Sequence, residues 1–123
     1  MDKSTTIELI DFILESIKLI NRRFKSIKSS DDFLDSDEGL DKLDAISMRI
    51  QAIGEALKNL YKREDELLLK VADKNYWSRI IKTRDFISHH YVDIDSETVF
   101  DICSNELTEL EMKVTEIKDS LNS

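Results

Sequence analysis

The sequence predicts an all-α protein, an antiparallel up-and-down bundle of four to five helices, on three observations. The 123 residues include no proline and only two glycines, so the turns that an all-β fold requires are scarce. Hydrophobic residues make up 41% of the chain and charged residues 36%, a composition that supports a folded core. Apolar residues recur at steps of three and four. This length without a linker predicts one domain, residues 1–123.

The first helix is predicted to begin at Thr5, because Thr5 and Glu8 have the spacing of a capping box. Lys18, Arg22, Arg23 and Lys25 surround an apolar stripe formed by Ile10, Ile13, Ile17, Ile20, Phe24 and Ile27. Residues 29–39 are acidic and typical of a connection. We expect Phe33 and Leu34 to anchor it against the core.

A second helix is predicted after Gly39, with a stripe formed by Leu43, Ile46, Ile50, Ile53, Leu57 and Leu60. Gly54 within it costs about 1 kcal/mol relative to alanine, which indicates a packing role. The charged residues 62–66 predict a short helix or a kink. A third helix runs from Trp77 toward His89. The fourth, capped by Asp95 or Ser96, carries an apolar stripe from Val99 to Leu121.

The formal net charge of −8 argues against a protein that coats nucleic acid along its whole surface. Residues 74–90 nevertheless carry +3, and both histidines lie in this segment. Cys103 is the single cysteine, so neither a disulfide nor a thiolate metal cluster is expected, and a reducing cytoplasm fits. No signal peptide or membrane span is evident, which predicts a cytoplasmic protein without a membrane partner.

The segment Arg84-Asp85-Phe86-Ile87-Ser88-His89-His90-Tyr91 holds the residues best suited to catalysis. A neutral imidazole can take the proton of an RNA 2′-hydroxyl, and a guanidinium can stabilise the charge that develops on the phosphate. On one uninterrupted helix, Arg84 and His89 would point about 140° apart. Either the helix ends near Ile87 or Ser88, or a second subunit completes the pair. This reaction needs neither a metal nor a cofactor, and the Glu-x-x-His pattern of di-iron bundles is absent.

The arginine-x4-histidine-x-tyrosine pattern resembles the signature of the HepT-like branch of the HEPN superfamily. The segment that ends in Gly54-Glu55-Ala56 is similar to the second-helix segment of that family. Trp77, seven residues before Arg84, resembles its usual tryptophan. The three matches together span most of the chain.

This resemblance implies a homodimer in which the motifs of both subunits line one cleft. It implies the toxin of a type VII-like toxin–antitoxin pair, a metal-independent endoribonuclease that cuts RNA. Arg84 and His89 would be catalytic, and a minimal nucleotidyltransferase antitoxin would attach AMP to Tyr91 and silence the enzyme. Asp85 and Glu55 are candidate supporting residues around the catalytic pair.

Asp85 departs from the family pattern, which usually has asparagine after the arginine. An ionised aspartate cannot donate a hydrogen bond, and it adds negative charge where RNA would bind. It therefore favours an alternative, a non-catalytic substrate-binding partner of a nucleotidyltransferase. A third possibility is a structural four-helix protein whose exposed surface serves only for assembly.

Overall fold

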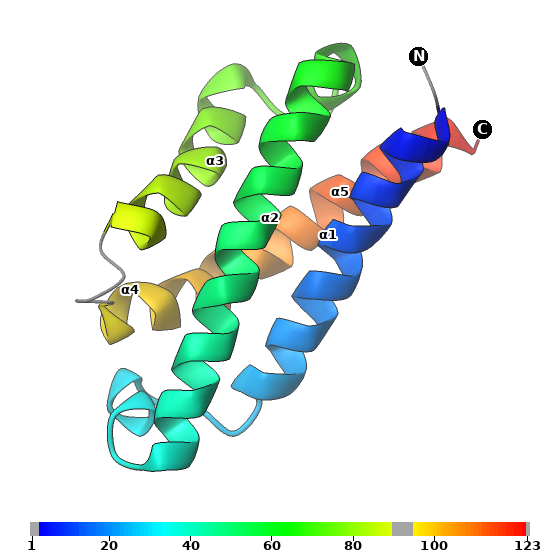
Figure 1. The fold of residues 1–123 in the computed structure, drawn as a ribbon. Helices are drawn as coiled ribbons and strands as arrows, with labels where there is room; N and C mark the ends of the chain where they lie inside the picture. The colour runs from blue at the N-terminus through cyan, green and yellow to red at the C-terminus, as the bar shows by residue number, and fades with distance from the viewer. Residues whose placement is uncertain (1–2, 90–94, 123) are drawn as a thin grey trace.

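The computed structural model describes the backbone of residues 3–89 and 95–122, and the side chains of residues 4–83 and 95–122. Its elements are α1 (Lys3–Phe24), the 3₁₀ turn η1 (Ser30–Phe33), α2 (Asp37–Leu69), α3 (Lys74–His89), α4 (Ser96–Asp101), the π-helical segment η3 (Ile102–Glu106) and α5 (Leu107–Leu121). Successive long helices run in opposite directions, with α2 between α1 and α3 (Figure 1). The predicted all-α up-and-down bundle is confirmed.

The stripe of α1 packs as predicted, but the helix begins earlier than predicted. Ile10, Ile13 and Ile17 are fully buried. Because α1 starts at Lys3, Thr5 lies inside the first turn and does not cap it. The neighbouring hydroxyl of Thr6 is buried and donates to Glu64 Oε2 at 3.4 Å, which connects the first turn of α1 to the far end of α2.

The acidic connection is shorter than predicted, because Ser36 caps α2. The Ser36 hydroxyl accepts a hydrogen bond from Gly39 N at 2.9 Å, so Gly39 already belongs to the helix. A Cβ on Gly39 would collide with the backbone oxygen of Asp32, so only glycine allows η1 to approach this closely. Phe33 is fully buried and anchors η1, whereas Leu34 is 54% exposed and does not.

Helix α2 is the longest element and carries the predicted kink. Glu64 has φ −138° and ψ 44°, outside the helical region, within the charged stretch where the sequence predicts a break. The buried residues of α2 lie before and after this point, from Gly39 to Leu68. The kink therefore redirects the last turn without ending the buried face.

The turn from α2 to α3 is fixed by Trp77, which is fully buried. Its Nε1–H donates both to the Leu68 carbonyl at 2.9 Å and to the Ala72 carbonyl at 3.1 Å. The Asp73 carboxylate also accepts from Tyr76 N at 2.8 Å at the start of α3. The indole therefore satisfies backbone carbonyls of the α2–α3 turn and fixes the direction in which α3 leaves.

The predicted fourth helix contains a π-helical segment that its sequence pattern did not reveal. Asp95 caps α4 by accepting from Glu97 N at 3.0 Å, as expected. Ile102 and Leu107 would lie about 140° apart on a regular α-helix. The i→i+5 geometry of η3 allows both side chains to be buried, at 9% and 3% exposure.

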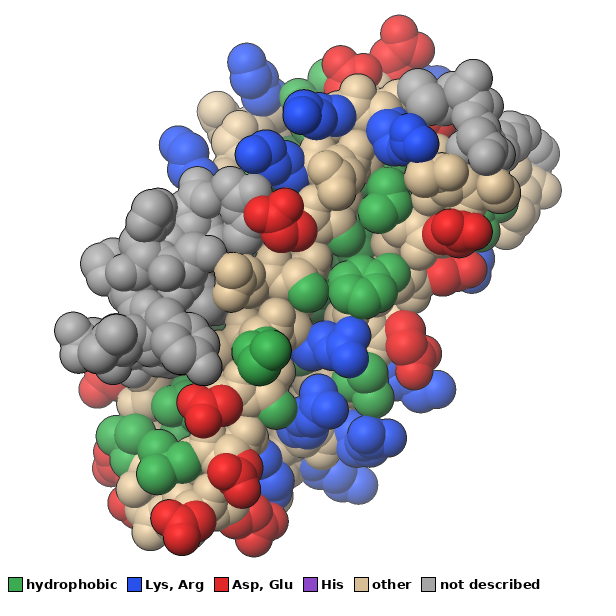
Figure 2. Space-filling model, in the orientation of Figure 1, with side chains coloured by type: hydrophobic (Ala, Val, Ile, Leu, Met, Phe, Trp, Pro, Cys, Tyr) green, Lys and Arg blue, Asp and Glu red, His purple; other side chains and the backbone are tan. Residues whose placement is uncertain are grey.

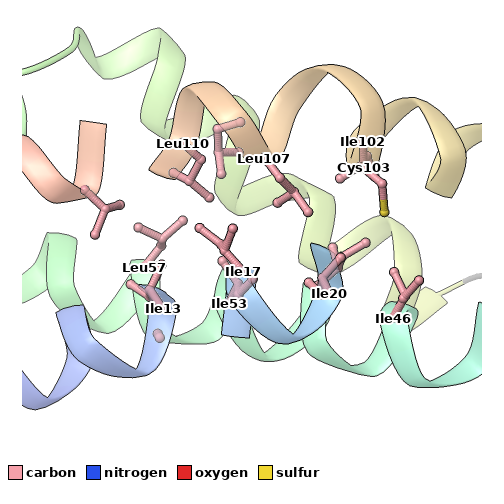
Figure 3. Packing of buried hydrophobic residues seen from close by; sticks show 14 of the residues in the cluster. Ile13, Ile17, Ile20, Ile46, Ile53, Leu57, Ile102, Cys103, Leu107 and Leu110 are labelled. Carbon is pink, nitrogen blue, oxygen red and sulfur yellow. The ribbon is translucent and has the colours of Figure 1, made fainter. Parts of the chain in front are cut away.

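The apolar stripes of α1 and α2 meet side chains from η3 and α5 in one core. Figure 3 shows Ile13, Ile17 and Ile53 pointing toward Leu107 and Leu110 on the opposite side. Cys103 belongs to this core, and burial raises the pKa of its thiol to about 12. Cys103 is therefore a small core residue whose thiol stays protonated near neutral pH.

Replacing Trp77 with phenylalanine should lower the free energy of unfolding by about 2 to 4 kcal/mol. The variant leaves the Leu68 and Ala72 carbonyls without their indole donor and removes part of a fully buried ring. Urea unfolding followed by circular dichroism measures the change. An unchanged midpoint and slope would show that the indole does not fix this turn.

Candidate active site

The motif lies at the C-terminal end of α3. Positions 84, 85 and 89 belong to that helix, of which His89 is the last residue. Their side chains, and the whole of Tyr91, lie outside the described part of the structure. The helix therefore gives the positions of Arg84, Asp85 and His89 along and around α3, and these positions limit how the pair can act.

Helix α3 extends through His89. The sequence allowed two arrangements of Arg84 and His89, an early end of the helix or a pair completed by a second subunit. The helix does not end at Ile87 or Ser88, so no early turn brings position 89 back toward position 84. Seven residues make nearly two full turns, so position 84 lies on the same face as Trp77, toward α2. Position 89 lies about 140° around the helix and about 7.5 Å farther along it.

The face of α2 opposite the motif contains small or polar residues. Gly54 is buried, and it lines a narrow cavity of about 20 Å³ together with Ile80 and Thr83 of α3. Gly54 is thus buried where α2 meets α3, and its packing role stays a prediction. Ser47, nearly two turns earlier on the same side of α2, is fully buried.

The hydroxyl of Ser47 has no hydrogen-bond partner among the described residues. Because α2 and α3 are antiparallel, Ser47 lies at the level of the last turns of α3, where the motif begins. A buried hydroxyl without a partner is uncommon and costs about 1–3 kcal/mol. The sequence indicates this buried hydroxyl only by placing a serine between Ile46 and Ile50 of the apolar stripe.

Glu55 is exposed on α2, directly after Gly54. It lies about 100° around the helix from Gly54, on the solvent side of the α2–α3 contact. This position keeps the carboxylate hydrated and outside the core. The proposed supporting role of Glu55 stays a prediction.

A polar cluster that the sequence pattern did not reveal joins α3 to η3 and α5. Arg79 Nη1 lies 2.6 Å from Glu106 Oε1, and its guanidinium carbon lies 5.4 Å from the centroid of the Tyr76 ring. The Lys113 ammonium lies 4.9 Å from the same centroid. Burial raises the pKa of Tyr76 to about 12, with Glu109 raising it further and Arg79 opposing. This cluster holds α3 against the C-terminal helices.

A broad hollow of about 760 Å³ between α1 and α5 does not suit a polyanion. Its lining residues are Asp11, Leu14, Glu15, Lys18, Glu111, Met112, Thr115, Glu116, Lys118 and Asp119. Acidic side chains outnumber basic ones there, and the hollow involves neither α2 nor α3. It is therefore not part of the candidate site.

The described residues provide neither a membrane span nor a metal site. No helix in residues 3–89 or 95–122 combines the length and apolar character that crossing a membrane requires. Among side chains that the structure places, no three His, Cys, Asp or Glu residues are arranged to hold a metal ion.

The structure is an all-α bundle with an Arg-x4-His motif at the end of α3, and comparison with known proteins identifies the family. The HepT-like ribonuclease family matches residues 13–117. This chain belongs to that family. No solved structure matches the chain significantly.

One curated relative is a protein of Methanocaldococcus jannaschii named "Gamma-glutamylcyclotransferase and putative RNase". It is 29% identical over 113 residues, which cover 92% of this chain and 47% of the relative. The chain thus spans about half the length of that protein.

Replacing Tyr76 with phenylalanine should leave the protein equally stable or stabilise it by about 1 kcal/mol near neutral pH. The Tyr76 hydroxyl is buried and has no hydrogen-bond partner among the described residues. Phenylalanine keeps the aromatic ring that Arg79 and Lys113 contact. Chemical denaturation of both proteins at pH 7 measures the difference. A decrease in stability of more than about 1 kcal/mol would mean that the hydroxyl has a stabilising partner.

The same pair of proteins should differ in alkaline solution. The unfolded chain loses the Tyr76 proton near pH 10, whereas the folded protein keeps it until about 12. As the pH rises from about 10 to about 12, the free energy of unfolding of the parent should therefore decrease relative to that of the phenylalanine variant. The slope should stay below about 1.4 kcal/mol per pH unit, because the half-buried phenol is partly screened. Cys103 contributes equally to both proteins and cancels.

Proposed function

We propose that this chain is the toxin of a type VII-like toxin–antitoxin pair. It acts as a metal-independent endoribonuclease, with Arg84 and His89 at a cleft between two copies of the chain. AMPylation of Tyr91 by a minimal nucleotidyltransferase silences it. Membership of the HepT-like ribonuclease family supports the activity class. The homodimer, the antitoxin and the modification are part of the proposal.

The observation that carries the proposal is the continuity of α3 through His89. Within one copy, positions 84 and 89 face directions about 140° apart and cannot converge on one phosphate group. A second copy, related by a two-fold axis near the end of α3, would bring His89 of one subunit toward Arg84 of the other. Such a dimer would contain two equivalent sites.

The reaction requires a base, an anion-binding group and an acid. Neutral His89 takes the proton from the 2′-hydroxyl, and the resulting oxygen attacks the adjacent phosphorus. Arg84 stabilises the negative charge on the phosphate oxygens as the bond to the 5′-oxygen breaks. The departing 5′-oxygen takes a proton from a water molecule, which acts as the acid, and the other product keeps a 2′,3′-cyclic phosphate; His89 returns its proton to the solvent. Asp85 or Glu55 would orient the cationic groups.

Tyr91 provides the regulatory step. Its phenol oxygen attacks the α-phosphorus of ATP on the partner enzyme, forming a phosphodiester bond to tyrosine and releasing pyrophosphate. The attached AMP adds a negative charge and a bulky nucleoside two residues after His89. Both effects oppose RNA binding in the cleft.

Asp85 supports the alternative function, a non-catalytic substrate-binding partner of a nucleotidyltransferase. A carboxylate next to Arg84 can neutralise the guanidinium that the phosphate needs. Under this alternative, the purified protein binds its nucleotidyltransferase and does not cut RNA. Cleavage of RNA by the purified protein therefore separates the two functions.

Substitution of His89 with alanine should reduce RNA cleavage by about 10²- to 10⁴-fold, and Arg84→Ala by about 10²- to 10³-fold. Single-stranded RNA incubated with unmodified protein and a chelator, followed by gel electrophoresis, measures this. His90→Ala and Lys82→Ala are matched controls and should cut at close to the parent rate. If the parent leaves RNA intact, the proposed activity is wrong. Cleavage that stops with the chelator contradicts the metal-free reaction.

Mixing the two inactive variants tests the shared site. When Arg84→Ala and His89→Ala subunits exchange, a mixed dimer keeps one intact pair, with Arg84 from one copy and His89 from the other. Partial activity should return, whereas a site within a single copy would stay inactive in every combination. Each variant alone, taken through the same exchange, is the control.

Incubation with ATP and the partner nucleotidyltransferase should add one AMP to Tyr91 and abolish cleavage. Intact-mass and peptide mass spectrometry locate the modification. Tyr91→Phe should retain nuclease activity yet resist silencing, because it lacks the acceptor oxygen. Tyr61→Phe is the matched control and should be modified and silenced like the parent. AMP on another residue, or silencing of Tyr91→Phe, would contradict this switch.

A further inference from the structure

A second cluster of positive charge lies outside α3. Residues 16–30 contain five basic residues and no acidic residue, although the chain as a whole carries −8. Figure 2 shows Lys and Arg side chains gathered over the C-terminal half of α1, and acidic side chains concentrated at the end formed by η1 and the start of α2. We name as the α1 cationic patch the residues Arg22, Arg23 and Arg49; Lys18 and Lys25 lie on the side of α1 away from Arg49, and Lys18 lines the acidic hollow against α5.

Helix α1 is strongly polarised. Its N-terminal half carries Glu8, Asp11 and Glu15, and Asp11 pairs with Lys118 at 2.7 Å. None of the ion pairs found among the described residues involves a member of the α1 cationic patch. Cations near a helix C-terminus interact favourably with the helix dipole, which accounts for Arg22 and Arg23 in the last turn. It does not account for Arg49, which lies on α2.

Arg49 is fixed beside an exposed aromatic ring. Its Nη1 donates to Ser16 Oγ at 3.2 Å, and Ser16 is fully buried. The guanidinium carbon lies 5.7 Å from the centroid of the Phe12 ring, and Phe12 is 40% exposed. The bond to Ser16 uses one of the five N–H donors of a guanidinium. A positioned arginine, a partly exposed aromatic ring and, about three turns farther along α1, two more arginines therefore occur along one side of α1.

We infer that the α1 cationic patch binds single-stranded nucleic acid, which for this protein is the RNA substrate away from the cut. The inference rests on the proposed ribonuclease function for the identity of the ligand. Arg22 and Arg23 contact backbone phosphates, Arg49 contacts another phosphate, and a base stacks on the exposed part of the Phe12 ring. The patch contributes affinity without reading sequence, because phosphates and aromatic stacking are common to every nucleotide.

Charge complementarity favours a polyanion over other occupants. The surrounding surface is acidic, so a polyanion gains most where the positive potential is concentrated. An anionic membrane would also meet the cations, but a flat bilayer does not use the arginine held beside an aromatic ring. The acidic residues 31–41 of another copy could also dock here. That contact would join two different surfaces and give open-ended assembly.

Fluorescence anisotropy with a labelled single-stranded oligodeoxynucleotide tests this inference. DNA lacks the 2′-hydroxyl, so the probe binds without being cut and the result does not depend on catalysis. Arg22→Gln with Arg23→Gln should weaken binding and reduce the slope of log affinity against log salt by about 1.4, or about 0.7 for each phosphate that is no longer neutralised. Phe12→Ala should weaken binding at least about fivefold with the salt slope unchanged.

The matched control is Lys58→Gln with Lys70→Gln, which removes the same charge from exposed positions elsewhere on α2 and at its end. It should bind close to the parent affinity, and circular dichroism should show the same fold for all proteins. Parent-like binding by the Arg22, Arg23 variant, or an equal decrease in the control, overturns the inference. It is also overturned if the patch is needed for binding to phosphatidylserine vesicles or for self-association but not for the oligonucleotide.

Failure of the inference and failure of the proposed function give different results. A parent that binds the oligonucleotide through the patch but cuts no RNA supports the inference and contradicts the nuclease proposal. A parent that cuts RNA while the patch variants bind the oligonucleotide normally supports the nuclease proposal and contradicts the inference.

Discussion

The buried face of α2 is the constraint on which the rest of the structure depends. One edge of this face packs against α1 and the other against α3, so α2 sets the positions of both helices. Leu57 and Leu60, fully buried near its middle, are the centre of this packing. Gly54 is buried where α3 passes, and Trp77 fixes the turn that starts α3. The orientation of the motif around α3 follows from these contacts.

The rotation of α3 has consequences for chemistry. Trp77 is fully buried, and position 84 follows it on the same face of the helix. The motif therefore begins on the face of α3 that turns toward α2. Arg79, elsewhere on the same helix, is paired with Glu106 across the surface. Its charge is taken up by this contact with η3, whereas the side chain at position 84 lies outside the described part of the structure.

Much of the fold could be predicted from the sequence, because steps of three and four report directly which side of a helix is buried. The stripe from Ile10 to Ile20 is buried as predicted. Helix boundaries are less accurately predicted, because they depend on single capping residues such as Ser36.

The site could be predicted only in part. Spacing along the chain gives the angle between Arg84 and His89 around one helix. Contacts between helices, such as that of Arg79 with η3, depend on how the elements pack and leave no local signal.

The distribution of charge links the fold to the proposed activity. A net charge of −8 would repel RNA if it were spread evenly over the surface. The structure instead concentrates the positive groups of residues 16–30 on one end of α1, beside Arg49, while α3 carries a separate positive segment. Because α2 lies between these two helices, a strand that contacts both must cross it. An acidic surface around two positively charged regions limits where a polyanion can bind. The negative net charge is therefore compatible with the proposed binding of RNA at selected regions, and it opposes nonspecific coating.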